Sequence, residues 1–206
     1  MRRGRLVTIE GIDGAGKTTL AASLSSALSA RGVDAYLMRE PGGVLVAERI
    51  RELVKNRDLE VSSRAEALLY AAARAQLVEE AIMPHLAKGS WVLLDRFVDS
   101  SLAYQGAGRG LGIEAIREIN EFATGGLRPD RTLLLALAPS EGRTRPEARS
   151  EPLDRLELER DEFHAAIASA YQQLATEDRD RIRVIDATLD PEAVLEAALR
   201  ELADLL

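Results

Sequence analysis

The residues best suited to chemistry form a glycine-rich stretch near the start of the chain, in the pattern G-x-x-x-x-G-K-[ST]. Its members are Gly11, Ile12, Asp13, Gly14, Ala15, Gly16, Lys17 and Thr18, and Thr19 follows directly. The glycines let backbone amides curl around phosphate oxygens, the lysine brings a positive charge to the β and γ phosphates, and the threonine hydroxyl suits Mg²⁺. This stretch, called the P-loop below, predicts a nucleoside triphosphate site. The alternative is a glycine-rich turn with a solvent-facing lysine.

The P-loop alone does not identify the group that receives the phosphate, because one fold serves many functions. The chain lacks the Asn-Lys-x-Asp sequence that reads guanine in GTPases, and it lacks the Leu-Ser-Gly-Gly-Gln signature of transport ATPases. A GTPase switch or a transporter subunit is therefore not expected.

The composition favours one globular domain, residues 1–206, without a membrane segment. The chain has 206 residues, a net charge of −7, no cysteine and two histidines, His85 and His164. Any metal should therefore be bound by oxygen rather than by thiolate, and a broad nucleic-acid-binding face is not expected. No apolar run approaches the roughly 20 residues of a membrane span, and the basic start lacks a secretory pattern. We expect no membrane partner and a cytoplasmic location.

The elements that must position the P-loop follow from hydrophobic periodicity. Short apolar runs at 6–9, 35–38, 91–94, 132–137 and 182–185 predict five buried parallel strands. Apolar residues at helical spacing separate them, among them Leu20, Leu24, Leu28, Phe163, Ile167, Tyr171, Val194, Ala198 and Leu202. This alternation predicts an α/β fold, a doubly wound five-stranded parallel sheet with helices on both faces and ligands at the carboxyl ends of the strands. Core packing is expected of Trp91, Phe97, Phe122, Phe163, Ile167 and Tyr171.

The alternation is interrupted between the fourth and fifth strands. Residues 139–152 contain serine, glycine, prolines and the arginines Arg143, Arg145 and Arg149. Such a composition predicts a loop, and we expect a short arginine-bearing lid over about 140–156.

Four further blocks resemble the bacterial thymidylate kinase family. They are Arg-Glu-Pro-Gly-Gly at 39–43, Tyr-Ala-Ala-Ala-Arg at 70–74, Asp-Arg-Phe at 95–97 and Ser-Ser-Leu-Ala-Tyr-Gln-Gly at 100–106. Their order and spacing match as well, and the resemblance runs over about 6–199. It implies an ATP-dependent dTMP kinase, which moves the γ-phosphoryl group of MgATP to dTMP to give dTDP and ADP for dTTP synthesis. It also implies a homodimer.

The resemblance assigns roles at the acceptor site. Arg96 and Arg51 would hold the dTMP phosphate, with Arg39 and Pro41 shaping the floor beneath it. The base and sugar would meet the remaining residues: Tyr70 stacking on thymine, Arg74 donating to O4, Ser101 and Gln105 at the base edge, Tyr104 under the deoxyribose and Asp13 at the 3′-hydroxyl.

The resemblance also assigns the metal and catalytic roles. Thr18, Glu40 and Asp95 would lie near Mg²⁺. Lys17, Arg96 and Arg149 would stabilise the transferred phosphoryl group, and Arg143 would lie on the adenine of ATP; Arg145 and Arg155 are further candidates. This chain departs from the family in two places: the fourth strand ends in Leu-Ala rather than in Asp or Asn, and the lid carries Pro146 and Pro152. Gly14 stands where eukaryotic-type members have an arginine, so the missing charge is expected from the lid.

Two other functions stay open at this point. One is a broader deoxynucleoside monophosphate kinase on the same fold, against which the set of Tyr70, Arg74 and Tyr104 discriminates. The other is an inactive nucleotide-binding regulator, although Lys17 and Asp95 are retained. Singly, Tyr70 and Tyr104 are also compatible with ordinary helix packing, and Arg74 with a solvated helix face.

Overall fold

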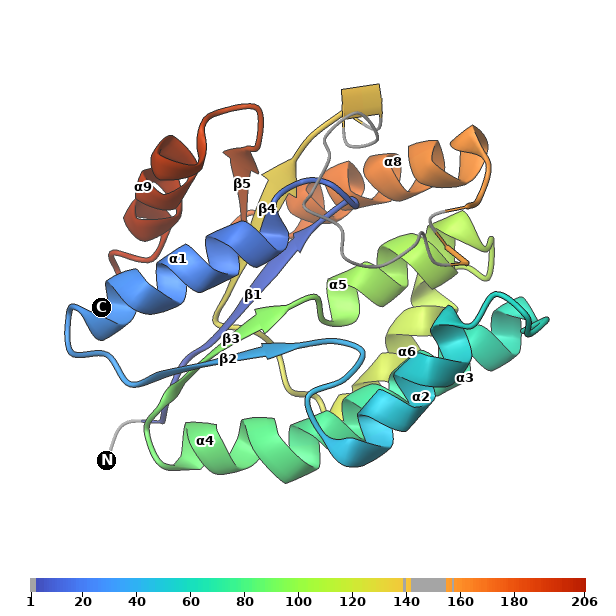
Figure 1. The fold of residues 1–206 in the computed structure, drawn as a ribbon, viewed down its shortest axis with the longest axis horizontal. Helices are drawn as coiled ribbons and strands as arrows, with labels where there is room; N and C mark the ends of the chain where they lie inside the picture. Colours follow the sequence, from blue (N-terminus) through green and yellow to red (C-terminus); the bar gives the residue numbers. More distant parts are fainter. Residues whose placement is uncertain (1–2, 139, 142–154, 157) are drawn as a thin grey trace.

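The described part of the chain is built around one five-stranded parallel sheet (Figure 1). A computed structural model describes residues 3–138, 140–141, 155–156 and 158–206. The strands lie in the order β2-β3-β1-β4-β5 and are β1 Leu6–Gly11, β2 Ala35–Arg39, β3 Trp91–Asp95, β4 Arg131–Ala136 and β5 Ile182–Asp186. This arrangement confirms the predicted fold class, with each strand within one or two residues of its expected bounds.

Helices connect the strands and cover both faces of the sheet (Figure 1). They are α1 Lys17–Ser29, α2 Leu45–Lys55, α3 Ser63–Leu77, α4 Met83–Ala87, α5 Val98–Ser101, α6 Ile113–Thr124, α8 Asp161–Glu177 and α9 Pro191–Glu201. Two π-helical segments, η1 Val78–Ile82 and η2 Leu102–Gly108, continue α3 and α5. π-Helical turns are uncommon and are often found at functional sites.

The two faces of the sheet bury different residues because side chains alternate along a strand. Val7 and Ile9 of β1 belong to the large core that contains Leu24 of α1 and Ala198 of α9. Leu6 and its neighbours Val92 and Leu94 instead form a second cluster with residues of η1 and α4, among them Val78, Ile82 and Leu86. The central strands are therefore covered on both sides, as a parallel sheet requires.

The edges of the sheet and one helix depart from the expectation of burial. β2 is an edge strand, and its Tyr36 and Leu37 are exposed. The expectation that Phe122 packs in the core is wrong, since this α6 side chain is 92% exposed. Trp91 and Phe97 are buried, as expected.

The strand register brings the ends of β1, β2 and β3 together. Asp95 at the end of β3 pairs with Ile9 of β1 and with Arg39 of β2. The loops that follow these strands, which carry the P-loop, Glu40 and Arg96, therefore meet at one edge of the sheet. In the described ranges no helix is both long enough and apolar enough to span a membrane.

Candidate active site

The P-loop joins β1 to α1 through glycines in the left-handed region. Gly11, Gly14 and Gly16 have φ of 141°, 78° and 89°, values that favour a residue without Cβ. At Gly11 a Cβ would also lie 2.7 Å from the Leu135 carbonyl oxygen. α1 begins at Lys17 with no side-chain cap and no acidic residue in its first turn. Its first amides thus remain available to an anion.

Lys17 lies folded over this loop. Its Nζ donates to the Ile12 carbonyl oxygen at 2.8 Å and is 3.9 Å from an Asp13 carboxylate oxygen. The side chain is buried, so its charge acts in surroundings that screen it less than water does.

Arg96 connects the P-loop to the helix that follows β3. Its guanidinium donates to the Asp13 carboxylate, to the Gly11 carbonyl oxygen at 3.1 Å and to the Tyr104 hydroxyl at 3.1 Å. The backbone of Arg96 has a φ of 70°, a conformation that costs free energy for a residue with a side chain and is enriched at functional sites. The structure thus brings three expected acceptor-site residues, Asp13, Arg96 and Tyr104, into direct contact.

The charges in this cluster stabilise each other. Burial opposes the charged form of Asp13, but the charges of Arg96 and Lys17 and a hydrogen bond from Tyr104 hold its pKa well below its usual value. Burial likewise opposes the charge of Arg96, while Tyr104 and Asp13 raise the pKa of its guanidinium. Asp13 is therefore an anion and Arg96 a cation at every physiological pH.

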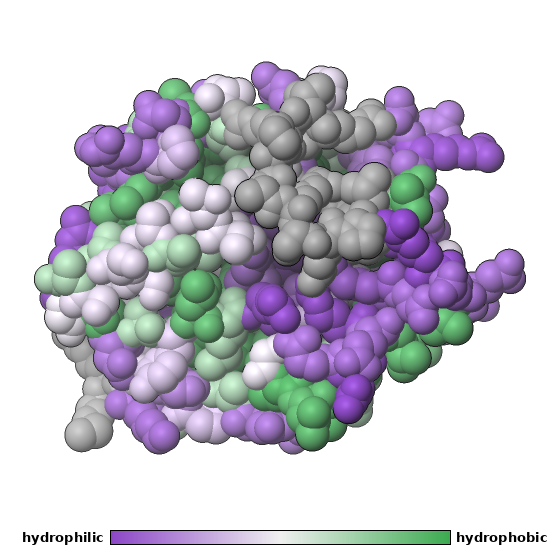
Figure 2. All heavy atoms as spheres, viewed as in Figure 1, coloured by the Kyte–Doolittle hydropathy of each residue, from purple (hydrophilic) through white to green (hydrophobic). Residues whose placement is uncertain are grey.

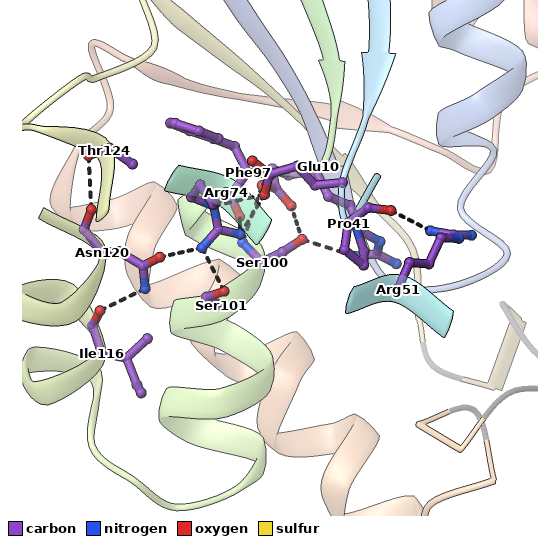
Figure 3. A network of polar contacts seen from close by, with 12 residues as sticks. Glu10, Pro41, Arg51, Arg74, Phe97, Ser100, Ser101, Ile116, Asn120 and Thr124 are labelled. Carbon is purple, nitrogen blue, oxygen red and sulfur yellow. Dashed lines mark hydrogen bonds and ion pairs between the residues drawn. The ribbon is translucent and has the colours of Figure 1, made fainter. Parts of the chain in front are cut away.

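The expected phosphate floor is only partly assembled. Arg51 of α2 donates from Nη1 to the Pro41 carbonyl oxygen at 2.9 Å, which ties α2 to the loop after β2 (Figure 3). Arg39 is largely exposed, and its Nη2 lies 3.4 Å from Glu48 Oε1.

The residues expected at the base lie on α3, α5 and η2. Arg74 donates to the Ser101 hydroxyl at 2.9 Å, so the structure brings this pair together (Figure 3). Gln105 instead donates to the buried Glu66 carboxylate at 2.9 Å. Tyr70 is half-buried and packs against the main core.

The three expected metal residues divide into a pair and a separate carboxylate. The Thr18 hydroxyl donates to Asp95 Oδ2 at 3.0 Å, so a hydroxyl and a carboxylate, both suited to Mg²⁺, lie side by side. Glu40 instead forms a buried ion pair with Arg74, with Oε2 2.6 Å from Nη2. Within the described ranges no cluster of three or more acidic or histidine side chains is suited to holding a metal.

Several site residues were not foreseen from the sequence. Glu10 of β1 is fully buried and accepts hydrogen bonds from the Phe97 amide at 2.7 Å, the Ser100 hydroxyl at 2.6 Å and the Tyr171 hydroxyl at 2.8 Å. Burial, with a contribution from Asp99, raises the pKa of Glu10. A carboxylate inside a strand that is otherwise apolar except for Thr8 was the available signal for it.

Most of the arginines expected in the lid lie outside the residues that the structure describes. Arg143, Arg145 and Arg149 lie outside the described residues, as does most of 140–156. Arg155 is described and donates from Nη2 to Glu66 at 2.6 Å.

Comparisons with known proteins agree on one family. A model of the family described as thymidylate kinase matches residues 9–198. The thymidylate kinase of Oenococcus oeni is 50% identical over 203 residues, with 97% of this chain and 95% of the relative covered. That of Lactobacillus delbrueckii subsp. bulgaricus is 45% identical over 201 residues, covering 96% and 95%. The solved structure of thymidylate kinase from Ehrlichia chaffeensis superposes with a TM-score of 0.77 at 30% identity and covers 97% of this chain and 99% of that one.

Proposed function

The chain belongs to the thymidylate kinase family and transfers the γ-phosphoryl group of ATP to dTMP; from that premise we propose how its residues perform the reaction. The products are dTDP and ADP. No relative reported above favours a broader deoxynucleotide kinase or an inactive regulator.

The observation that carries the proposed site is the contact between the P-loop and η2. Asp13 of the P-loop is held by Arg96 and by Tyr104 of η2. A nucleotide held by Arg96 and Tyr104 would therefore lie directly beside a triphosphate on the P-loop. Such proximity is the main contribution that a protein makes to phosphoryl transfer.

We assign the dTMP phosphate to Arg96 and Arg51, the sugar to Tyr104 and Asp13, and the base to Tyr70, Arg74, Ser101 and Gln105. Arg39 and Pro41 border the phosphate. A guanidinium suits this role because its planar fork matches two phosphate oxygens. The cation–π contact of Arg96 over the Tyr104 ring, at 4.9 Å, supports a rigid guanidinium here.

The donor is ATP, which the P-loop amides, Lys17, Thr18 and Thr19 would hold. Negative charge spreads over the oxygens of the transferred group, and Lys17 is a charge fixed beside them. We keep Arg149 for the same group and Arg143 for the adenine as assignments from the family resemblance.

We propose that Mg²⁺ accompanies ATP and is held by Thr18 and Asp95. Their oxygens fit a hard cation, and the 3.0 Å contact between them places both at the end of the P-loop. Glu40 pairs with Arg74 through Oε2, whereas its buried Oε1 has no hydrogen-bond partner in the described ranges, and we keep Glu40 near the metal as an assignment from the family resemblance. Mg²⁺ would offset the charge of the β and γ phosphates.

Transfer of labelled γ-phosphate from ATP to dTMP tests the donor, the acceptor and the metal together. We expect labelled dTDP with Mg²⁺ and a loss of at least a hundredfold in rate with EDTA. Transfer at an equal rate in EDTA would remove Mg²⁺ from the proposal.

We further propose that the enzyme is a homodimer that pairs through α2, α3 and α6. α2 packs against α3 and α3 against α6 (Figure 1), and each carries exposed apolar side chains: Leu53 (46%), Leu68 (57%) and Phe122 (92%). Figure 2 shows hydrophobic residues at the surface on the side where α2 and α3 lie. A second copy of the same face is the simplest apolar partner, because most soluble oligomers are symmetric pairs.

Sedimentation tests the dimer. Phe122→Asp should shift the protein to a monomer at micromolar concentration. Leu189→Asp, at another exposed leucine outside these helices, is the control and should leave the mass unchanged. An unchanged mass in both variants would contradict the interface.

We also propose that residues 1–206 act as one domain and that the enzyme works in the cytoplasm. Its substrates are nucleotides whose charged phosphates do not enter a bilayer unaided.

A further inference from the structure

All three nitrogen atoms of the Arg74 guanidinium have protein partners, and the side chain is buried. Nε donates to Glu40 Oε2 at 2.7 Å, and Nη2 donates to the Phe97 carbonyl oxygen at 2.9 Å and lies 2.6 Å from Glu40 Oε2 as an ion pair. Nη1 donates to the Ser101 hydroxyl at 2.9 Å and to Asn120 Oδ1. Four hydrogen bonds and one ion pair thus surround the five N–H groups of this arginine. A base oxygen can therefore receive a hydrogen bond from Arg74 only if one present partner gives way.

Asn120 of α6 is a fixed partner. Its amide nitrogen donates to the Ile116 carbonyl oxygen at 2.8 Å, so its oxygen faces Arg74 (Figure 3). The reverse orientation would put the amide N–H groups against Nη1, donor against donor, and the oxygen against a carbonyl. Asn120 is also 2% exposed, and loss of its contact would leave two buried polar groups unpaired, which costs more than an exposed bond does.

Ser101 is the partner that can give way. Its hydroxyl rotates and can donate as well as accept. Glu40 and Phe97 hold the far side of the guanidinium, where the carboxylate and the backbone carbonyl are both buried. The N–H group that points to Ser101 is thus the one that an arriving base can take or share.

We propose that Asn120 is a positioning residue that sets base selectivity, because it fixes which N–H group of Arg74 is offered to the base. This inference rests on the proposed placement of Arg74 at the thymine. Thymine O4 accepts the offered N–H, whereas the amino group of cytosine meets it donor to donor. Without Asn120 the guanidinium loses the restraint on Nη1 and can turn from the base edge. dTMP then loses a contact that dCMP never had.

Two substitutions at Asn120 test the proposal. Asn120→Leu has a similar size and cannot hydrogen-bond, and Asn120→Ser is too short to reach Arg74. Serine is smaller than asparagine, and the space that it leaves adjoins a cavity of about 90 Å³ that Asn120 borders. In both variants the ratio of kcat/KM for dTMP to that for dCMP should fall roughly tenfold, the effect of one lost hydrogen bond to a charged group. The change should lie mainly in KM for dTMP, with KM for ATP unchanged.

Two further variants separate this role from a general loss of packing. Asn120→Asp keeps an oxygen acceptor toward Nη1 but loses the bond to the Ile116 carbonyl oxygen, so it should retain the ratio within about threefold while its melting temperature falls. Thr124→Val is the matched control one turn further along α6, because its hydroxyl donates only to the Asn120 backbone carbonyl oxygen at 2.9 Å. It should lower the melting temperature without changing the ratio. Folding is checked by circular dichroism, and the serine variant decides if the leucine variant does not fold.

An unchanged ratio in folded Asn120→Leu or Asn120→Ser, or an equal drop in Thr124→Val, would overturn the inference. Arg74→Lys shows which proposal has failed. If Arg74→Lys also keeps the ratio, the placement of Arg74 at the base is wrong. If Arg74→Lys lowers the ratio while the Asn120 variants keep it, only the role of Asn120 is wrong.

Discussion

The hydroxyl of Tyr104 donates to the carboxylate of Asp13 at 2.9 Å, across 91 residues of sequence. The bond joins η2 to the P-loop, and Arg96 contacts both partners. The ring and the hydroxyl of Tyr104 therefore have separate roles. The ring would lie against the sugar, and the hydroxyl holds a P-loop carboxylate.

Two substitutions at Tyr104 should separate these roles. Tyr104→Ala removes the ring that would exclude a 2′-hydroxyl, so the preference for dTMP over ribothymidine monophosphate should fall about tenfold. Tyr104→Phe keeps the ring and should retain that preference, while KM for dTMP rises a few-fold because Asp13 and Arg96 lose a partner. Values of kcat/KM for both acceptors check this. A ribose preference that survives in Tyr104→Ala would remove the ring from this role.

Lys17→Ala should lower kcat by about a hundredfold or more without unfolding the protein, because its charge strengthens as negative charge develops on the transferred group. Lys88→Ala, in the exposed turn after α4, is the control and should be near wild type. Steady-state kinetics and circular dichroism check both variants. A folded Lys17→Ala enzyme with normal kcat would contradict the donor site.

Arg96→Ala and Arg51→Ala should weaken dTMP binding more than ATP binding. Loss of a guanidinium from a phosphate should raise KM for dTMP about ten- to a hundredfold. Arg49→Ala is the matched control on α2, because Arg49 is exposed and pairs with Glu52. An effect confined to KM for ATP would count against the assignment of the acceptor phosphate.

Stability should also depend on the protonation of Glu40. Burial raises the pKa of Glu40 to about 7 from its ordinary 4.5, although Arg74 lowers it. The native state then binds this proton more tightly than the unfolded state does. The contribution of Glu40 to the free energy of unfolding is therefore complete below pH 4.5 and is lost as the pH rises through about 7. The shift corresponds to a contribution of about 3 kcal/mol.

Urea unfolding of wild type and Glu40→Gln between pH 4.5 and 7.5 checks this. The wild type should lose free energy of unfolding relative to the variant as the pH rises, because glutamine does not titrate. Glu10, whose pKa is also raised by burial, contributes to the raised pKa of Glu40, so Glu10→Gln alone and the double variant are measured beside Glu40→Gln to separate the two carboxylates. A difference that stays constant with pH would contradict the raised pKa.

Local sequence patterns were sufficient to predict the P-loop and the five strands. The glycines and Lys17 are contiguous, and the apolar runs have the length of buried strands. Periodicity could not predict that Phe122 is exposed. An apolar stripe on a helix can pack into the core of its own chain or remain at the surface, and the sequence pattern is the same in both cases. Periodicity likewise missed the exposure of β2, since strand order is a tertiary property.

The polar networks could not be predicted from sequence patterns because their members are far apart in the chain. Asn120 meets Arg74 across 46 residues and Gln105 meets Glu66 across 39, and no spacing rule links such positions. The ion pair of Glu40 with Arg74 was not foreseen either, because the family blocks place Glu40 after β2 but do not show that Arg74 reaches it.

The most direct test of the proposed acceptor site is ADP release with dTMP, dUMP, dCMP and ribothymidine monophosphate, each supplied in turn with MgATP. The site predicts the order dTMP, dUMP, dCMP in kcat/KM, because dUMP lacks only the apolar contact of the methyl group whereas dCMP presents a donor to Arg74. The ribonucleotide should be poorer than dTMP by about ten- to a hundredfold. Equal kcat/KM for the four acceptors, or a preference for dCMP, would contradict the account.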